Sequence, residues 1–219
     1  DFATVRSRLL ELIPNGFDYA PARRETILHS RSVFPKTAPA ALILKEPAYA
    51  LQTKRLLQIF PDARFIFVYR DPRAQVNSVR HMPFGSHLLT FNTFFWNRVQ
   101  KHVLKLKSSM PDRVLCVAYE DLVRNTEDSL INICQFFQIP FNEKMLHYHE
   151  SGDAIKSEYG LNDPVILKYG ESSFRAPDAA LIDKWKNDLS ERDIRIIEAG
   201  CHRQMKKLQY VPLHSVRIT

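Results

Sequence analysis

The chain has little cysteine, little glycine and no long apolar stretch. Its three cysteines, Cys116, Cys134 and Cys201, lack the spacing of a metal site, and a sparse, odd set argues against a disulfide framework. We therefore expect buried free thiols. No run of about 18 or more apolar residues is present, so the sequence predicts no membrane-spanning helix. The opening residues 1–3 also lack the basic-then-apolar pattern of a signal peptide.

The charge balance is mildly basic, with 31 Lys and Arg against 24 Asp and Glu and a net charge of +7. This balance favours an anionic ligand or partner, such as a nucleotide, a sulfated polymer, nucleic acid or a membrane surface. A mildly basic protein without such a partner fits equally well. Because the basic residues do not form one long run, we expect no nucleic-acid partner.

Apolar periodicity predicts strands that alternate with helices. Three short apolar runs, residues 41–44, 64–69 and 114–118, are typical of buried strands. Helical spacing predicts helices over residues 49–60, 72–80, 87–109, 126–137 (capped by Thr126), 178–186 and 190–208. The alternation predicts an α/β fold, with a parallel sheet flanked by helices, in a single domain over residues 1–219. The polar residues 150–178 indicate a long functional loop.

Charged or polar residues follow each predicted strand. They are Lys45 and Glu46, Arg70 and Asp71, and residues 119–121. Parallel sheets bind ligands beyond the carboxyl ends of their strands, so these residues predict a ligand crevice, although turns are polar in any case.

Arg70 carries the sharpest prediction, because it ends an apolar strand and precedes Asp71 and Pro72, which together predict a helix start. A guanidinium beside a helix N-terminus can bind a phosphate through two hydrogen bonds. Ser78 lies two turns into that helix, away from the buried face marked by Val76 and Val79, and can offer its hydroxyl to the same group. A salt-bridged arginine and a solvated serine explain these residue types equally well.

Three segments resemble a known family. Residues 44–47 (LKEP), 60–66 (FPDARFI) and 69–73 (YRDPR) are similar to the middle of sulfotransferases that use 3′-phosphoadenosine 5′-phosphosulfate (PAPS). The resemblance implies the P-loop NTPase-like sulfotransferase fold. It also implies that a strand-end arginine and a serine eight residues later, here Arg70 and Ser78, bind the 3′-phosphate of the donor.

Two later segments extend the resemblance to roughly residues 41–208. Residues 119–122 (YEDL) resemble the family's next block, which implies that Tyr119 lies near the adenine. Residues 185–190 (WKNDLS) resemble its closing tryptophan segment, before which a loop arginine commonly reaches the 3′-phosphate. The loop residues that match this role by order alone are Ser172, Ser173 and Arg175.

The low glycine content bears on the rest of the donor site. Members of this family carry an N-terminal strand–loop–helix that cradles the 5′-phosphosulfate with backbone amides and a basic residue. The chain has only six glycines, with no glycine-rich loop before Lys45, and it does not start with Met. We therefore expect the gene product to begin earlier and the chain to be the C-terminal portion of an N-terminally incomplete domain. Such a chain would bind the nucleotide poorly and need not turn over.

The resemblance implies transfer of a sulfuryl group from PAPS to a hydroxyl acceptor, with adenosine 3′,5′-bisphosphate as product. Such a transfer needs in-line geometry, positive charge at the transferring group and a base for the acceptor, and it requires no metal. We hypothesise that Lys45 stabilises charge on the bridging oxygen, and that Glu46 orients Lys45 or acts as the base. The alternative is that Lys45 and Glu46 form a simple turn pair.

Two other functions stay open. Another P-loop-like enzyme, such as a nucleotide or small-molecule kinase, would need a glycine-rich loop and a magnesium carboxylate, and the sequence shows neither. A non-catalytic module would instead hold anions on its basic surface. The residues leave open the oligomeric state and the acceptor, which is a carbohydrate, a peptide or a small molecule. They also leave open the compartment, although sparse cysteines slightly favour the cytoplasm over the Golgi lumen.

Overall fold

The computed structural model describes residues 42–82, 85–151 and 175–214, with a few isolated positions before them. The chain divides into two compact units, Asp1–Arg64 and Phe65–Thr219, and each is described by itself. The single domain expected over the whole chain stays a prediction. In the ranges that the structure describes, no helix is long and apolar enough to cross a membrane.

The first unit is helical where one helix is expected over residues 49–60. Two elements occupy this segment, the 3₁₀-helix η2 (Pro47–Leu51) and the α-helix α3 (Thr53–Ile59). The first and last residues of α3, Thr53 and Ile59, are buried.

The strand expected over residues 41–44 is wrong in its described part. Residues 42–46 have no regular structure, and Ile43 is 81% exposed. An apolar run becomes a strand only where a neighbouring strand supplies the ladder hydrogen bonds. Among the described residues, none pairs with residues 42–44.

The second unit alternates strands and helices as predicted. It starts with β1 (Phe65–Tyr69), α4 (Pro72–Val79), α5 (Leu89–Ser109), β2 (Val114–Ala118), α6 (Tyr119–Arg124) and α7 (Thr126–Phe137). Three 3₁₀-helices follow, η3 (Glu143–Met145), η4 (Tyr148–Ser151) and η6 (Ala179–Leu181), and then α10 (Trp185–Asp188) and α11 (Glu191–Lys207).

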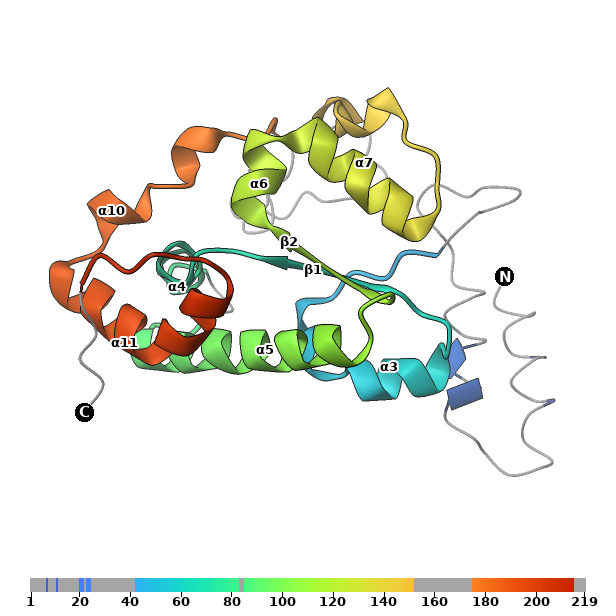
Figure 1. The fold of residues 1–219 in the computed structure, drawn as a ribbon, viewed down its shortest axis with the longest axis horizontal. Coiled ribbons are helices and arrows are strands. Elements are labelled where there is room, and N and C mark those ends of the chain that lie inside the picture. The colour runs from blue at the N-terminus through green and yellow to red at the C-terminus, as the bar shows by residue number, and fades with distance from the viewer. Residues whose placement is uncertain are drawn as a thin grey trace. The chain divides into compact units, whose positions relative to one another are not determined.

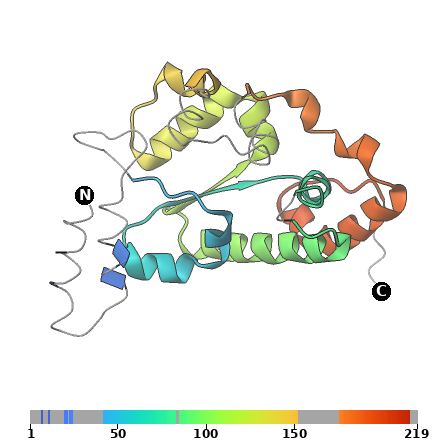
Figure 2. The same cartoon turned by 180° about the vertical axis from the view of Figure 1, so that it is seen from behind.

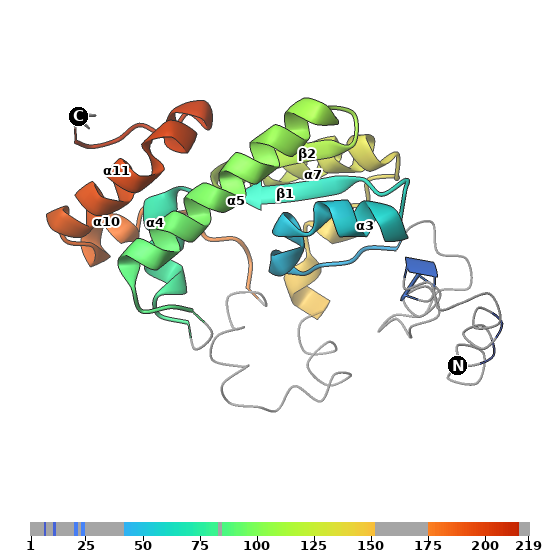
Figure 3. The same cartoon turned by 90° about the horizontal axis from the view of Figure 1, so that it is seen from below.

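β1 and β2 are parallel neighbours, with Phe65 opposite Val114 and Tyr69 opposite Ala118. The chain crosses between them through α4 and α5, which is the kind of connection that parallel strands require. Figures 1 and 2 show α5 and α11 on one side of the two strands and α6 and α7 on the other. In Figure 3, α5 lies across the strands. The predicted α/β fold with a parallel sheet flanked by helices is confirmed.

Local capping fixes the starts of two helices. At α4 the Asp71 carboxylate accepts a hydrogen bond from the backbone N–H of Arg73 at 2.8 Å, with Pro72 in the first helical position. At α11 the Ser190 hydroxyl accepts from the backbone N–H of Asp193 at 3.2 Å. Both starts were predicted from the sequence.

Three details differ from the prediction. Thr126 is the first helical residue of α7 and not its cap, because its hydroxyl donates back to the Val123 carbonyl. The helix expected over residues 178–186 is divided into η6 and α10. Helix α6 was not predicted, since its polar first residues read as a turn after β2.

Helices α5 and α11 approach closely at Gly200. A Cβ atom added there would lie 2.6 Å from Cγ2 of the buried Thr93, so a glycine is needed at this crossing. The next residue, Cys201, is buried with its sulfur 3.6 Å from the Thr93 carbonyl oxygen. Trp96 and Ile197 complete the contact between the two helices inside the main apolar core.

Candidate functional site

Two side chains leave the sheet side by side at the carboxyl ends of its strands. Arg70 follows β1 and Tyr119 follows β2, directly after the paired residues Tyr69 and Ala118. The guanidinium carbon of Arg70 lies 4.4 Å from the centre of the Tyr119 ring, within range of a cation–π attraction. The structure therefore brings together two residues that the sequence assigned to one ligand.

Arg70 is held in place from two directions. The indole Nε1–H of Trp96 donates to the Arg70 carbonyl at 3.1 Å, and Nη2 of Arg70 donates to the Leu181 carbonyl at 2.9 Å. The Nε atom of Arg70 is buried and has no hydrogen-bond partner in the described part of the chain. Burying an N–H donor without an acceptor costs free energy. An anion such as a phosphate is an acceptor that suits a guanidinium.

Ser78 lies on the last turn of α4. Val76 and Asn77 are buried on this helix, whereas Ser78 and Val79 are both partly buried, so the orientation predicted for Ser78 stays a prediction. Among the interactions of the described residues, none joins Ser78 directly to Arg70. Their common role as ligands of one phosphate stays a prediction.

The other side of the same strand ends is acidic. A cavity of about 320 Å³ lies there, and its charged lining residues are Asp71, Glu120, Asp121, Asp183 and Arg124. Neither Arg70 nor Tyr119 lines it. Asp71 lines the cavity and Arg70 does not, so the two residues that follow β1 direct their side chains to different sides of the strand end. Carboxylates repel a phosphate, so an anionic ligand belongs on the Arg70 side.

Arg73 serves the fold rather than a ligand. Its Nη2 lies 2.6 Å from Oδ2 of Asp71, its Nη1 lies 2.7 Å from Oε1 of Glu198, and its guanidinium stacks 4.2 Å above the Trp185 ring. Burial lowers the pKa of Arg73, but hydrogen bonds and charges from Asp71 and Glu198 outweigh this effect and raise it overall. The charge of Arg73 is therefore fixed and already paired.

Two buried carboxylates tie the C-terminal segment to the strand ends. Glu198 accepts hydrogen bonds from the backbone N–H groups of residues 213–214 at 2.8 and 3.1 Å. Glu120 accepts from the backbone N–H of Asp71 at 2.9 Å and from the Tyr210 hydroxyl at 2.8 Å. Burial raises the pKa of the Tyr210 phenol, and the nearby Glu120 adds to the rise. These contacts hold the start of α4, and with it the main chain beside Arg70.

Tyr148 is a neighbour of the site that sequence reasoning did not assign. Its hydroxyl donates to the Arg175 carbonyl at 2.8 Å. Burial raises the pKa of Tyr148, and the nearby Tyr119 adds to the rise. Tyr148 therefore links Arg175, which is exposed, to the neighbourhood of Tyr119. Its only sequence signal was an aromatic residue between two histidines.

The structure does not test the remaining predicted site residues against Arg70. Ser172 and Ser173 lie outside the described residues. Lys45 and Glu46 are exposed in the first unit, and they do not follow a strand, so the strand-exit position expected for them is wrong. Their catalytic roles stay predictions. Within the described ranges, no group of three or more His, Cys, Asp or Glu is arranged to hold a metal ion.

A family model described as "Sulfotransferase family" matches residues 7–143 of the chain. The chain belongs to the sulfotransferase family. The match extends over more than half of the sequence and includes Arg70, Ser78 and Tyr119. The family that the short motifs indicated is therefore confirmed.

Curated relatives of this family member are named as protein-tyrosine sulfotransferases. A putative one from Caenorhabditis briggsae is 30% identical over 124 residues, which cover 54% of this chain and 43% of the relative. A putative one from Caenorhabditis elegans is 26% identical over 160 residues, covering 70% and 60%. Protein-tyrosine sulfotransferase 1 of Danio rerio is 27% identical over 168 residues, covering 73% and 46%. The chain thus spans about half the length of the curated relatives it matches.

Two solved sulfotransferase domains share the fold. The domain from the curacin biosynthetic pathway has a TM-score of 0.58 at 20% identity, and the match covers 80% of this chain and 64% of that domain. The domain from the Synechococcus PCC 7002 olefin synthase has a TM-score of 0.58 at 23% identity, with 76% and 57% covered. The predicted P-loop-like sulfotransferase fold is confirmed by this likeness, which concerns the fold alone.

Proposed function

We propose that the protein transfers a sulfuryl group from PAPS to a hydroxyl acceptor, and that this acceptor is a tyrosine of a protein. Family membership supports the reaction class. The names of the relatives support the acceptor. The observation that carries the donor assignment is the Arg70 guanidinium, which is fixed at the strand end with a buried, unpaired Nε.

In this proposal Arg70 binds the 3′-phosphate. Its Nε–H is buried, and a hydrogen bond from a guanidinium to a charged phosphate oxygen is strong. The Tyr119 ring supports the guanidinium from one side and offers an aromatic surface to the adenine. The Ser78 hydroxyl, on the last turn of α4, adds a hydrogen bond to the same phosphate. We assign Ser173 and Arg175 to the same phosphate, and the hydrogen bond from Tyr148 to the Arg175 carbonyl holds the main chain of Arg175.

The catalytic part of the proposal concerns Lys45 and Glu46. When bound, PAPS supplies the sulfuryl group. The acceptor hydroxyl must lose its proton while its oxygen bonds to sulfur and the sulfur bond to the 5′-phosphate oxygen breaks. In this proposal Lys45 supplies the positive charge that stabilises the negative charge developing on the bridging oxygen. Glu46 either removes the acceptor proton or orients Lys45. Replacing Lys45 by alanine should abolish most turnover while leaving product affinity within a few-fold.

The test of the donor site compares two ligands by titration calorimetry. One is adenosine 3′,5′-bisphosphate, and the other is adenosine 5′-monophosphate, which lacks the 3′-phosphate. Arg70→Ala should lower the affinity for the bisphosphate about 10- to 100-fold, as expected for a charged hydrogen bond, and change that for the monophosphate little. Ser78→Ala should act in the same selective way with a smaller effect. Arg195→Ala is the matched control, since this exposed arginine pairs with Glu191 on α11.

Equal losses for both ligands, or an unchanged bisphosphate affinity, would contradict the 3′-phosphate assignment. Thermal stabilisation by ATP with Mg²⁺ in place of the bisphosphate would favour a kinase, and stabilisation of the full-length protein by neither would favour a non-catalytic module. The acceptor is tested by sulfate transfer from PAPS to a tyrosine peptide, its phenylalanine counterpart and a carbohydrate. Transfer to the carbohydrate alone would overturn the tyrosine assignment.

A further inference from the structure

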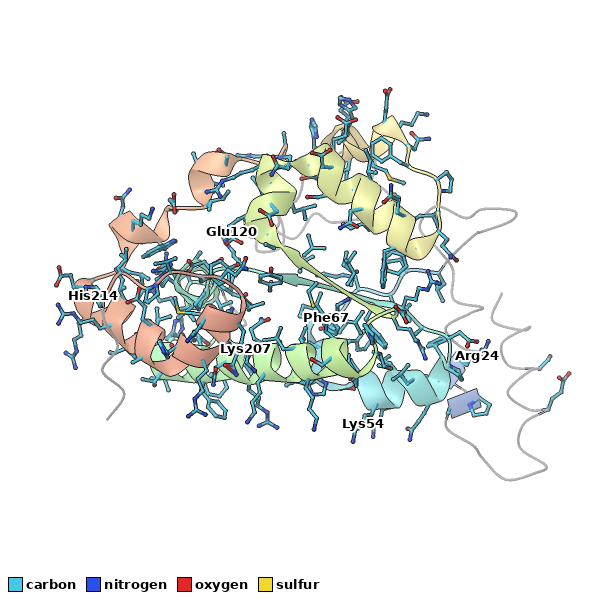
Figure 4. All side chains as sticks on the ribbon, viewed as in Figure 1. Arg24, Lys54, Phe67, Glu120, Lys207 and His214 are labelled. Carbon is cyan, nitrogen blue, oxygen red and sulfur yellow. The ribbon has the colours of Figure 1, made fainter. Side chains whose placement is uncertain are left out.

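Helix α5 has an outer face that the proposed site does not use. The inner face carries the buried residues Asn92, Thr93, Trp96, Gln100 and Val103. Residues of the opposite face are exposed, and Figure 4 shows side chains of α5 that project away from the strands. We define the α5 outer face by its exposed members Leu88, Phe91, Phe94, Phe95, Arg98, Lys101 and Lys105.

The first half of this face is an exposed apolar cluster. Leu88 is 67% exposed, and Phe91, Phe94 and Phe95 are 53%, 59% and 46% exposed. Their spacing of three and four residues places them on one stripe of the helix. The rings of Phe91 and Phe95 stack with centroids 6.4 Å apart and planes 14° apart. Such a cluster differs from single apolar side chains scattered over a surface, which need no explanation.

The second half of the face is basic. Arg98, Lys101 and Lys105 continue the same stripe, and the 21 residues of α5 include no Asp or Glu. In the part of the chain that the structure describes, no carboxylate pairs with these three residues. Exposed Lys186 and Arg195 on other helices, in contrast, have acidic partners within one helical turn. Among the described residues, therefore, nothing compensates the positive charge of the α5 outer face.

We propose that the α5 outer face docks on an anionic lipid surface. Helices that lie in the membrane interface combine an apolar face containing phenylalanine and leucine with a polar face rich in lysine and arginine. The α5 outer face presents both kinds of residue along one stripe. The phenylalanine rings would enter the acyl boundary, and the basic residues would contact the lipid phosphates. This inference does not depend on the proposed sulfotransfer.

The composition favours a lipid surface over a protein partner. Protein interfaces are enriched in aromatic residues and arginine but depleted in lysine. The α5 outer face combines exposed phenylalanine rings with a basic part in which two of three residues are lysine. A lipid surface is compatible with both features, because it accepts apolar rings without hydrogen bonds and attracts lysine through charge alone.

The test is cosedimentation of the full chain with phosphatidylcholine vesicles that do or do not contain phosphatidylserine. We expect binding to the anionic vesicles only, weakening as salt is raised. Lys101→Glu with Lys105→Glu should reduce binding at least about tenfold, since each basic residue near the surface contributes about 1 kcal/mol. Phe91→Ser with Phe94→Ser should also reduce it, with an unchanged melting temperature because both rings are exposed. The matched control is Arg124→Glu with Lys144→Glu, an equal charge change on exposed residues outside α5.

Several results would overturn the proposal. One is absence of binding to anionic vesicles by the folded chain. Another is an equal loss of binding in the control variant, which would show an effect of net charge alone. Binding to polyglutamate but not to vesicles would point to an acidic protein partner instead. Retained vesicle binding in both α5 variants would move the contact to another part of the molecule.

Discussion

The guanidinium of Arg70 lies 4.4 Å from the centre of the Tyr119 ring, although 48 residues separate the two positions in the chain. Each follows the last residue of one of two paired parallel strands, so their contact is a direct result of strand register. The ring attracts the cation without accepting a conventional hydrogen bond. This leaves Nε of Arg70 free for a ligand.

Removing the Tyr119 ring should therefore weaken nucleotide binding through Arg70. Tyr119→Ala is expected to lower the affinity for adenosine 3′,5′-bisphosphate about 3- to 30-fold, the range of a partly desolvated cation–π contact. Tyr119→Phe keeps the ring and should retain most of the affinity. Titration calorimetry on both variants checks this, and unchanged affinity in the alanine variant would contradict it.

Loss of the Tyr148 hydroxyl should act on the nucleotide through Arg175. Tyr148→Phe removes the hydrogen bond to the Arg175 carbonyl but keeps the ring, so we expect a 2- to 10-fold loss of bisphosphate affinity, about one hydrogen bond. In an Arg175→Ala background the same substitution should have no further effect. Additive losses in the double variant, measured by calorimetry, would show that Tyr148 acts independently of Arg175.

Glu198 should be needed for stability. Glu198→Gln leaves the buried Arg73 without one of its two carboxylates and is expected to lower the free energy of unfolding by about 3–5 kcal/mol. The control Glu191→Gln breaks an exposed pair with Arg195 and should cost less than about 1 kcal/mol. Urea denaturation followed by circular dichroism measures both. Similar losses of unfolding free energy in the two variants would contradict the claim that the buried ion pair stabilises the protein more than the exposed one.

The close approach at Gly200 predicts that one substitution destabilises the protein and that a second substitution removes this loss of stability. Gly200→Ala should destabilise the protein by about 1–2 kcal/mol, because the new methyl group meets Cγ2 of Thr93. In a Thr93→Ser background that methyl group is absent, while a hydroxyl remains for the bond to the Leu89 carbonyl. There Gly200→Ala should be neutral or stabilising by up to about 1 kcal/mol, from its better helix propensity. Thermal melts of the four variants complete the cycle.

The buried thiol of Cys201 predicts a loss of stability in alkali. Burial raises the pKa of Cys201 from 9.0 to about 12, and the charge of Asp71 adds to the rise. Because the pKa of the thiol is higher in the folded than in the unfolded protein, its contribution to the free energy of unfolding is complete below pH 9. That contribution is lost as pH rises toward 12. Relative to Cys201→Ala, the wild type should lose about 1.4 kcal/mol of unfolding free energy between pH 8 and pH 10. Urea titrations at both pH values check this, and parallel curves for the two proteins would contradict it.

Features set by short-range chemistry were predictable from the sequence. The Asp71 cap and Pro72 start of α4 need only neighbouring residues, and β1 and β2 carry strong strand patterns. The meeting of Arg70 and Tyr119 follows from these elements, because parallel strands end at a common edge.

Features set by distant partners were not predictable in the same way. Residues 42–44 are apolar enough for a strand, but pairing depends on a neighbour that a local pattern does not contain. The hydrogen bond from Tyr148 to the Arg175 carbonyl joins segments 27 residues apart, and no sequence motif predicts it. Helix α6 was missed because acidic residues after a strand suit a turn as well as the first turn of a helix.

The C-terminal segment has a practical consequence for any recombinant version of this protein. Glu198 receives two of its hydrogen bonds from the main chain of residues 213–214, and it also holds Arg73 in helix α4. A clone that stops at residue 212 would keep every helix and strand described here and still expose a buried carboxylate to water. Trimming the tail for crystallisation would therefore disturb the helix that follows the anion-binding arginine, far from the cut in sequence.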